Sequence, residues 1–253
     1  MSGSTIKVAV LGARGRMGSH VVSAVEAATD MSVVAQIDVD DDLDKQLADS
    51  GAQVAVDFTL PSVTEANVTA LIAAGIHAVV GTTGWDEEAL ARIEKQIAGR
   101  NVGVLIAPNF SLSAVLAMNF AQQAAQWFES AEVIELHHPD KVDAPSGTAV
   151  HTAEMIARVR READLGEMPD ATTQALDGAR GALVAGVPVH SVRLRGLVAH
   201  EEILFGGPGE QLTIRTDSFD RISFMPGVLA AIRKIGQRPG LTVGLDQLLD
   251  IGK

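Results

Sequence analysis

The chain has 253 residues, of which 47% are hydrophobic, and its 20 basic and 32 acidic residues give a formal net charge of −12. This length supports a large core in one domain or two. The acidic balance argues against a nucleic-acid ligand, because phosphate binding needs a basic footprint. The sequence has no cysteine and no tyrosine, which excludes disulfides, thiolate nucleophiles, cysteine–zinc sites and a Tyr–Lys proton relay. Histidine, lysine and carboxylates remain as general acids and bases.

The sequence carries no signal that favours a membrane or export. No apolar run approaches the ~18 residues of a membrane span. The first residues, Met-Ser-Gly-Ser-Thr, lead into an apparent strand without the basic region and apolar core of a signal peptide. We therefore expect a cytoplasmic protein without membrane association.

Strands and helices alternate over residues 1–110. Apolar β-branched runs predict strands at 6–11, 32–37, 52–58, 77–80 and 102–106. Helical patterns lie between them at 20–28, 62–74 and 86–98, and a polar stretch is expected at 40–49. This alternation predicts an α/β fold with a doubly wound parallel sheet.

The pattern changes after residue 110. A helix is predicted at 111–128, a strand at 132–137 and a helix at about 148–161, followed by a Gly/Pro/Asp-rich stretch. Three strands, expected at 188–194, 197–205 and 211–216, have short turns between them and predict an antiparallel meander. We therefore expect a second, α+β domain with a mixed or antiparallel sheet at about 111–218. A helix near 224–235 is expected to return to the first domain, so that residues 219–253 complete it.

A glycine-rich turn joins the first strand to the first helix. Gly12, Gly15 and Gly18 form a G-x-x-G-x-x-G variant of the dinucleotide fingerprint. Such glycines let the backbone approach a pyrophosphate, whose charge is held by the N–H groups of the helix N-terminus. Asp38 ends the second strand 20 residues after Gly18, where an acid accepts hydrogen bonds from ribose hydroxyls. The pattern predicts a Rossmann-type site for NADH or NADPH, although an ordinary strand–helix turn with a surface aspartate is the alternative. The predicted loop contacts are Gly12, Ala13, Arg14, Gly15, Arg16 and Met17.

Two arginines in this turn bear on the choice of cofactor. The guanidinium groups of Arg14 and Arg16 are suited to a 2′-phosphate, whereas Asp38 favours the free hydroxyl of NADH. Both features together predict tolerance of both cofactors, unless both arginines are merely solvated. Replacing both arginines with alanine should then raise the KM for NADPH more than that for NADH.

Two later loops follow predicted strands. Because a ligand of a doubly wound sheet crosses the carboxyl ends of the strands, both loops are expected to meet the cofactor. Hydroxyls, backbone amides and a side-chain amide there suit the ribose and the nicotinamide carboxamide, although each loop alone is equally compatible with a structural role. The predicted contacts are Gly81, Thr82, Thr83, Ala107, Pro108, Asn109 and Phe110.

Residues 135–148 concentrate the titratable groups of the second domain. Side chains alternate along a strand, so His137 shares a face with Glu135 while His138 faces the other way. Lys141 follows closely, and the amides of Ser146, Gly147 and Thr148 lie at the start of a helix that can hold a substrate carboxylate. The pattern predicts proton transfer to a small anionic substrate.

Two other interpretations of this segment remain. One is a capped helix after a polar loop, with Ser146 or Thr148 as the cap. The other is a metal site, which is disfavoured because neighbouring strand residues diverge. Its candidate ligands would be His137, His138, Asp140, Asp143 and His151.

Other functions also fit parts of this pattern. One is a Rossmann dehydrogenase acting on another small acid, which assays with candidate substrates would separate. Another is a nucleotide-binding regulator, which would bind NADH without turnover. A metal-dependent hydrolase would lose its activity to chelators.

Taken together, residues 12–18, 81–84, 107–110 and 135–149 resemble the 4-hydroxy-tetrahydrodipicolinate reductase (dihydrodipicolinate reductase) family of bacterial lysine and diaminopimelate biosynthesis. The resemblance implies an NAD(P)H-dependent oxidoreductase acting on a small dicarboxylate. It also implies a homotetramer with an N-terminal Rossmann domain and a C-terminal domain for substrate binding and assembly.

The resemblance also implies roles for individual residues. His137 would be the proton donor and acceptor and Lys141 a proton donor, while His138, Gly147 and Thr148 would bind substrate. Some members follow the strand-end acid with an arginine that serves NADPH. Here Val39 stands at that position, so the arginines of the glycine loop are the visible candidates for a 2′-phosphate.

Overall fold

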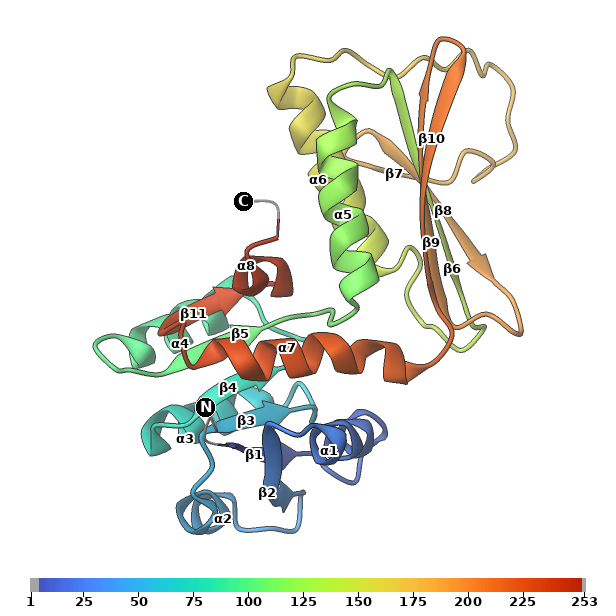
Figure 1. The fold of residues 1–253 in the computed structure, drawn as a ribbon. Coiled ribbons are helices and arrows are strands. Elements are labelled where there is room, and N and C mark those ends of the chain that lie inside the picture. Colours follow the sequence, from blue (N-terminus) through green and yellow to red (C-terminus); the bar gives the residue numbers. More distant parts are fainter. Residues whose placement is uncertain (1–4, 252–253) are drawn as a thin grey trace. The chain divides into compact units, whose positions relative to one another are not determined.

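The protein, described by a computed structural model over residues 5–251, divides into two compact units (Figure 1). The first unit comprises the chain up to Leu112 together with the chain from Arg221 onward, and the second comprises Ser113–Asp220. Within residues 5–251 no helix combines the length and the apolar character needed to cross a membrane.

The first unit is built on a six-stranded sheet with the order β11-β5-β4-β3-β1-β2. All five strand pairs are parallel, which confirms the predicted doubly wound sheet. Every residue of β3, and likewise of β5, is buried, as expected for strands covered on both faces. The strands are β1 Ile6–Leu11, β2 Met31–Ile37, β3 Val54–Asp57, β4 His77–Val80, β5 Gly103–Ile106 and β11 Gly240–Val243.

Helices cover both faces of this sheet (Figure 1). Alternate strand residues form one core with apolar residues of α2, α3 and α4, such as Leu47, Leu71 and Ile93. Helices α1 and α7 lie on the opposite face. The helices are α1 Arg16–Ala27, α2 Leu43–Ser50, α3 Thr64–Ala74, α4 Glu87–Ile97, η1 (3₁₀) Arg221–Phe224, α7 Met225–Ile235 and α8 Leu245–Leu249.

Helix α2 occupies most of the polar stretch at 40–49, where the sequence pattern predicted no helix. Asp42 caps this helix by accepting a hydrogen bond from the backbone N–H of Lys45 at 3.1 Å. Only Leu47 is buried among its residues. One buried residue in two turns gives too weak a periodicity to predict a helix from sequence.

The second unit contains a five-stranded mixed sheet with the order β10-β9-β6-β8-β7. Its core joins the buried face of the sheet to alanine-rich faces of two helices, which lie on the same side of it (Figure 1). The helices are α5 Leu112–Ala125 and α6 Gly147–Glu162. The strands are β6 Ser130–His137, β7 Ala182–Val184, β8 Val187–Arg193, β9 Ala199–Gly207 and β10 Glu210–Ser218.

The predicted antiparallel meander is wrong in one respect. Strands β9 and β10 form the expected hairpin, but β8 does not pair with β9. Strand β6 lies between them, parallel to β8 and antiparallel to β9. The short connection at 194–198 therefore crosses the end of β6 instead of closing a hairpin. Consequently β6, which carries Glu135 and His137, is central and has partners on both sides.

Candidate functional site

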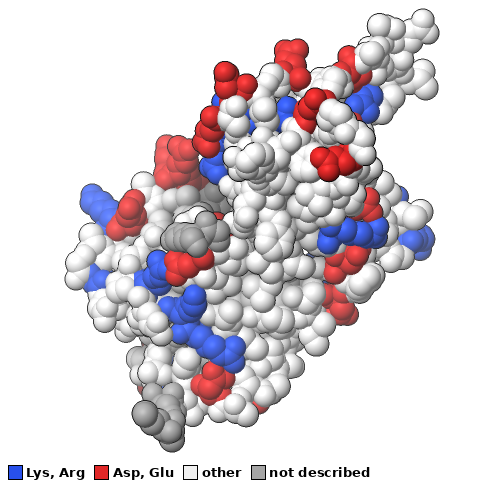
Figure 2. Space-filling model, turned by 45° about the horizontal axis from the view of Figure 1, so that its top comes forward, with Lys and Arg blue, Asp and Glu red and all other residues white. Residues whose placement is uncertain are grey.

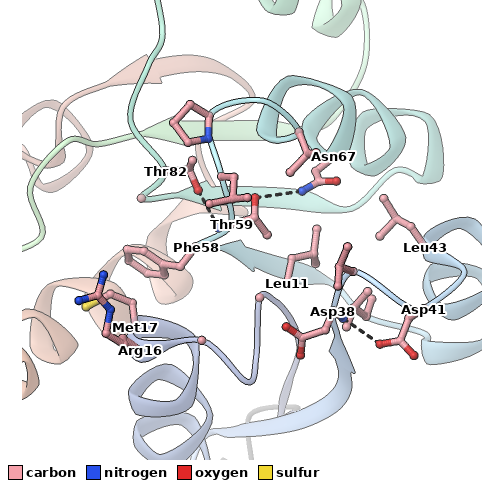
Figure 3. Close-up of a pocket in the computed structure, with 18 of the residues that line it drawn as sticks. Leu11, Arg16, Met17, Asp38, Asp41, Leu43, Phe58, Thr59, Asn67 and Thr82 are labelled. Carbon is pink, nitrogen blue, oxygen red and sulfur yellow. Dashed lines mark hydrogen bonds between the residues drawn. The ribbon is translucent and has the colours of Figure 1, made fainter.

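The first unit has a cavity of about 640 Å³ at the carboxyl ends of its strands (Figure 3). It is lined by residues that end or follow β1, β2, β3 and β4. This is the edge at which doubly wound sheets bind their ligands. The residues predicted for cofactor binding that line it are Gly12, Gly15, Arg16, Met17, Asp38, Gly81, Thr82 and Thr83.

The glycine loop is too tight for side chains at two positions. Gly12 has a φ of +75°, and a Cβ built on it would lie 2.5 Å from the carbonyl oxygen of Phe58. A Cβ on Gly18 would lie 2.0 Å from the carbonyl oxygen of Gly12. Helix α1 then begins with Gly15 as its N-cap, with no side-chain cap and no acidic residue in its first turn. Its positive N-terminal end is therefore available to an anionic group such as a pyrophosphate.

Asp38 and Arg14 are paired at one side of this cavity. One carboxylate oxygen of Asp38 accepts hydrogen bonds from both the backbone N–H and the Nε of Arg14, each at 3.0 Å. The same guanidinium lies 3.9 Å from Asp40 and 4.0 Å from Asp41. Arg16 lies at the other side of the pocket from Asp38, close to Met17 (Figure 3). The two arginines of the loop therefore have different surroundings.

A buried carboxylate that the sequence analysis did not single out binds several residues of the pocket wall from behind. Asp57 ends β3, is fully buried and accepts hydrogen bonds from the Thr59 backbone N–H at 2.9 Å and hydroxyl at 2.7 Å. It also accepts from Asn67 Nδ2 at 3.0 Å, Thr82 Oγ1 at 2.9 Å and Thr64 Oγ1 at 3.3 Å. Thr59, Asn67 and Thr82 line the cavity. The hydrogen bond to Asp57 therefore fixes the position of the Thr82 hydroxyl in the pocket wall.

Residues 107–110 do not line this cavity. Ala107 and Phe110 are buried, and the ring of Phe110 meets that of Phe58 edge-on at 5.7 Å. The Asn109 side-chain oxygen accepts from the backbone N–H of Ser111 at 2.8 Å. Phe58 itself lines the cavity, so Phe110 supports the pocket wall from behind.

In the second unit a buried carboxylate joins β6, β8 and the start of α6. Glu135 is fully buried and accepts from both terminal nitrogens of Arg193 at 2.7 Å. Its Oε2 lies 2.5 Å from Nδ1 of His137, and its Oε1 accepts from the Ser146 backbone N–H at 3.1 Å. Burial alone raises the pKa of Glu135, but hydrogen bonds from Arg193, Ser191 and His137 outweigh it and lower the pKa to about 2. Glu135 is therefore ionised and fixes the ring of His137.

Glu135 contacts one ring nitrogen of His137, Nδ1, and the other is Nε2. Burial, the largest cause, lowers its pKa, while the hydrogen bond and charge of Glu135 oppose that shift. A carboxylate at Nδ1 favours the tautomer with the proton on Nδ1 and leaves Nε2 to exchange a proton.

Lys141 lies in the loop between β6 and α6. Its ammonium lies 2.7 Å from Asp143 Oδ1, and the carbonyl oxygen of Asp143 accepts from Arg193 at 2.7 Å. The loop includes a cis peptide bond between Ala144 and Pro145. Asp143 therefore links Lys141 to the guanidinium of Arg193, which also binds Glu135.

Helix α6 begins directly after this loop. Ser146 is its N-cap, and the Ser146 hydroxyl accepts from the Ala149 backbone N–H at 3.2 Å. No acidic residue lies in its first turn. A Cβ built on Gly147 would meet nothing within 4 Å, so the backbone there is open to a ligand. The predicted cap is therefore present, and the backbone N–H of Gly147 donates to the carboxylate of Asp143.

The metal site that the sequence left as an alternative can be compared with this geometry. Over residues 5–251 no three His, Asp or Glu side chains are arranged to hold a metal ion. Figure 2 shows acidic and basic side chains interspersed on one face of the molecule.

Comparison with known proteins identifies the family of this chain. The family model described as "Dihydrodipicolinate reductase, N-terminus" matches residues 6–110, and the one described as "Dihydrodipicolinate reductase, C-terminus" matches residues 113–249. The chain belongs to the dihydrodipicolinate reductase family. The resemblance read from the sequence is thereby confirmed.

Relatives of this family cover nearly the whole chain. A protein of Beutenbergia cavernae named 4-hydroxy-tetrahydrodipicolinate reductase is 66% identical over 98% of this chain and 100% of its own length. One of the same name from Streptomyces coelicolor is 58% identical over 98% of this chain and 99% of its own length. Among solved structures, a dipicolinate-bound dihydrodipicolinate reductase from Paenisporosarcina sp. TG-14 is 36% identical, with a TM-score of 0.86 over 96% of this chain and 98% of that chain.

Proposed function

We propose that this protein reduces 4-hydroxy-tetrahydrodipicolinate to tetrahydrodipicolinate with NADH or NADPH, as a step of lysine and diaminopimelate biosynthesis. The observation that carries the proposal is the position of Glu135, which joins His137 and Arg193 to the backbone N–H of Ser146 at the start of α6. One buried group thus connects a proton-exchanging imidazole to an anion-binding helix end. Family membership supports the same reaction.

The cavity of the first unit fits a nicotinamide dinucleotide. The glycine loop admits no Cβ at Gly12 or Gly18, and the uncapped start of α1 suits a pyrophosphate. Asp38 lies where a ribose hydroxyl is bound in such folds. When bound, the cofactor supplies the hydride.

The start of α6 suits one carboxylate of the substrate. The N–H of Ser146 donates to Glu135, and the N–H of Gly147 donates to the carboxylate of Asp143. The resemblance to the family implies that Gly147 and Thr148, in the first turn of α6, bind the anion. Lys141 adds a positive charge to the loop, and His138 completes the set of substrate-binding residues implied by the family. The relative from Paenisporosarcina binds dipicolinate, a planar dicarboxylate of the same class.

His137 and Lys141 are the proton donors of this proposal. Reduction needs one hydride and one proton, and the 4-hydroxyl group leaves as water. His137 exchanges its proton at Nε2 while Glu135 stabilises the imidazolium form. Lys141 offsets negative charge on the ring or gives the proton itself.

We further propose that the protein is a cytoplasmic homotetramer in which the second unit provides both substrate binding and assembly. Sedimentation of the purified protein tests the oligomeric state directly.

Steady-state kinetics of two variants test the assigned roles. A positioned acid contributes ~10²–10⁴-fold, so His137→Ala and Lys141→Ala should lower kcat by that order while changing KM less. Val142→Ala is a matched control, because this side chain of the same loop is fully exposed. Variants of His137 and Lys141 that turn over at the wild-type rate would show that the roles are assigned wrongly.

A further inference from the structure

A second buried carboxyl group faces Glu135 across the sheet of the second unit. Glu201 on β9 is paired directly with Glu135 on β6 in the antiparallel register. Only 7% of Glu201 and none of Glu135 is exposed. Glu135 has Arg193 as its cation, whereas Glu201 forms no ion pair within the part of the chain that the structure describes.

The hydrogen bonds of Glu201 indicate its protonation state. The Thr152 hydroxyl lies 2.9 Å from Oε1 of Glu201 and 3.0 Å from the backbone carbonyl oxygen of Thr148. A hydroxyl has one proton and cannot donate to both acceptors. Both contacts are satisfied when the Glu201 carboxyl donates to Thr152 and Thr152 donates to Thr148. This chain of bonds requires neutral Glu201.

The charged groups around Glu201 favour the same state. Glu135 and His137 of β6 and Arg193 of β8 share its face of the sheet, and Arg193 is committed to Glu135. On β10 the residue opposite Glu201 is the neutral Thr216.

The helices over this face add no competing charge. Residues 112–125 of α5 include no charged residue. On the buried face of α6 the only charged side chain is Arg160, which donates to the backbone carbonyls of Phe128 and Glu129. Burial is the main cause that raises the pKa of Glu201 to about 7. A hydrogen bond that Thr152 donates to the ionised carboxylate opposes the shift, and the charge of Glu135 adds to it.

We propose that neutral Glu201 is a positioning residue for the anionic substrate: through Thr152 it fixes the first turn of α6, and its ionisation weakens anion binding there. The inference rests on the proposed function, since it concerns the substrate carboxylate at Gly147 and Thr148. Ionised Glu201 draws the single proton of Thr152 toward itself, so the carbonyl of Thr148 loses that bond. It also places an uncompensated negative charge behind the helix end that receives the anion.

The pH dependence of dipicolinate binding tests this role. Calorimetry on the full-length protein would give the Kd from about pH 6 to about pH 8.5, a range that brackets the ionisation of a carboxyl with a pKa near neutrality. Wild-type affinity should fall about fivefold over this range, the size expected for one partly screened charge. Glu201→Gln, which mimics the neutral acid, should bind as tightly as wild type at the low end and lose this fall. Dipicolinate stays doubly ionised throughout, and burial lowers the pKa of His137, which moves its ionisation toward the acid end of the range.

Neighbouring residues provide the controls. Glu202→Gln removes an acid from the opposite face of β9, where it pairs with Arg215, and should keep the wild-type pH dependence. Thr152→Val breaks the chain of bonds and should weaken binding at the low end of the range, whereas Thr152→Ser should restore it.

The outcomes separate this proposal from the proposed function. A Glu201→Gln variant with the same pH-dependent fall as wild type overturns the positioning role. If that variant does not fold, the Thr152→Val and Thr152→Ser pair decides, because equal affinities for the two overturn the role as well. If wild type binds NADH but no dipicolinate at any pH, the substrate class of the proposed function has failed instead.

Discussion

Nδ1 of His137 lies 2.5 Å from Oε2 of Glu135, two residues earlier on the same face of β6. The carboxylate cannot turn away, because Arg193 and the backbone N–H of Ser146 hold both of its oxygens. The ring of His137 is therefore oriented by a group that is itself fixed at several points. This arrangement resembles the carboxylate–histidine pairs that orient imidazoles for acid–base work.

Glu135→Gln should impair catalysis more than substrate binding. The amide preserves the shape but not the charge that stabilises protonated His137, so kcat should fall by about 10²-fold. Because Glu135 raises the pKa of His137, that pKa should fall further in the variant. A kcat–pH profile and NMR titration of the imidazole measure both effects. Glu132→Gln on the opposite face of β6 is the control, and a wild-type kcat in Glu135→Gln would refute the role.

Arg193→Ala should destabilise the protein at neutral pH. Removing one partner of a buried ion pair costs about 3–5 kcal/mol, since Glu135 is then left charged without a counterion. The folded-state pKa of Glu135 lies at about 2, below its ordinary value of 4.5, so the pair's contribution is complete above the ordinary value and is lost as the pH falls toward 2. The free energy of unfolding of the wild type should therefore fall as the pH decreases through that acid range. The free energy of unfolding of Arg193→Ala should fall less over the same range.

Thermal unfolding at several pH values measures this effect. Arg195→Ala provides a control, because Arg195 is exposed and lies beyond the end of β8. Equal Tm values for wild type and Arg193→Ala at neutral pH would contradict the prediction.

Asp57→Asn should weaken cofactor binding without touching the cofactor-contacting loop. The carboxylate accepts from Thr59, Thr82 and Asn67, and an amide in its place turns one acceptor into a donor. Leaving buried donors unsatisfied costs about 1–3 kcal/mol. The Kd for NADH and for NADPH should therefore rise alike, as measured by fluorescence titration. Asp44→Asn, on the exposed side of α2, should change neither value.

Arg14 and Arg16 should differ in their effect on cofactor choice. Arg14 lies among Asp38, Asp40 and Asp41, so Arg14→Ala exposes a 2′-phosphate to three carboxylates and frees Asp38 for a ribose hydroxyl. The ratio of KM for NADPH to KM for NADH should rise about tenfold in Arg14→Ala. Arg16→Ala, at the other side of the pocket, should leave this ratio unchanged. The opposite order of the two ratios would assign the 2′-phosphate to Arg16.

The parts of the fold that follow from local pattern were predictable. The strands of the first unit are continuous apolar runs, and the glycine loop has a fixed spacing from Asp38. The shared face of Glu135 and His137 follows from strand periodicity alone.

The parts that depend on long-range register were not predictable. Arg193 meets Glu135 only because β8 pairs with β6 in parallel, across 58 residues of sequence. The same holds for Glu201, which faces Glu135 through the pairing of β9 with β6. The role of Asp57 was missed because the sequence around an acid at a strand end does not show whether its carboxylate is buried and hydrogen-bonded or exposed to solvent. Its partners lie on three different segments.

Gly18→Ala should disrupt the nucleotide loop. A Cβ at this position would lie 2.0 Å from the carbonyl oxygen of Gly12, 2.7 Å from its carbonyl carbon and 2.9 Å from Cα of Ala13. All three atoms belong to the backbone, so relief requires α1 to move away from β1 and open the loop. The expected cost is about 2–4 kcal/mol of stability, with at least a tenfold rise in the Kd for NADH. Ser19→Ala, at the exposed next position, should bind NADH normally. An unchanged Tm and Kd in Gly18→Ala would show that the close approach of α1 to the loop is not required for cofactor binding.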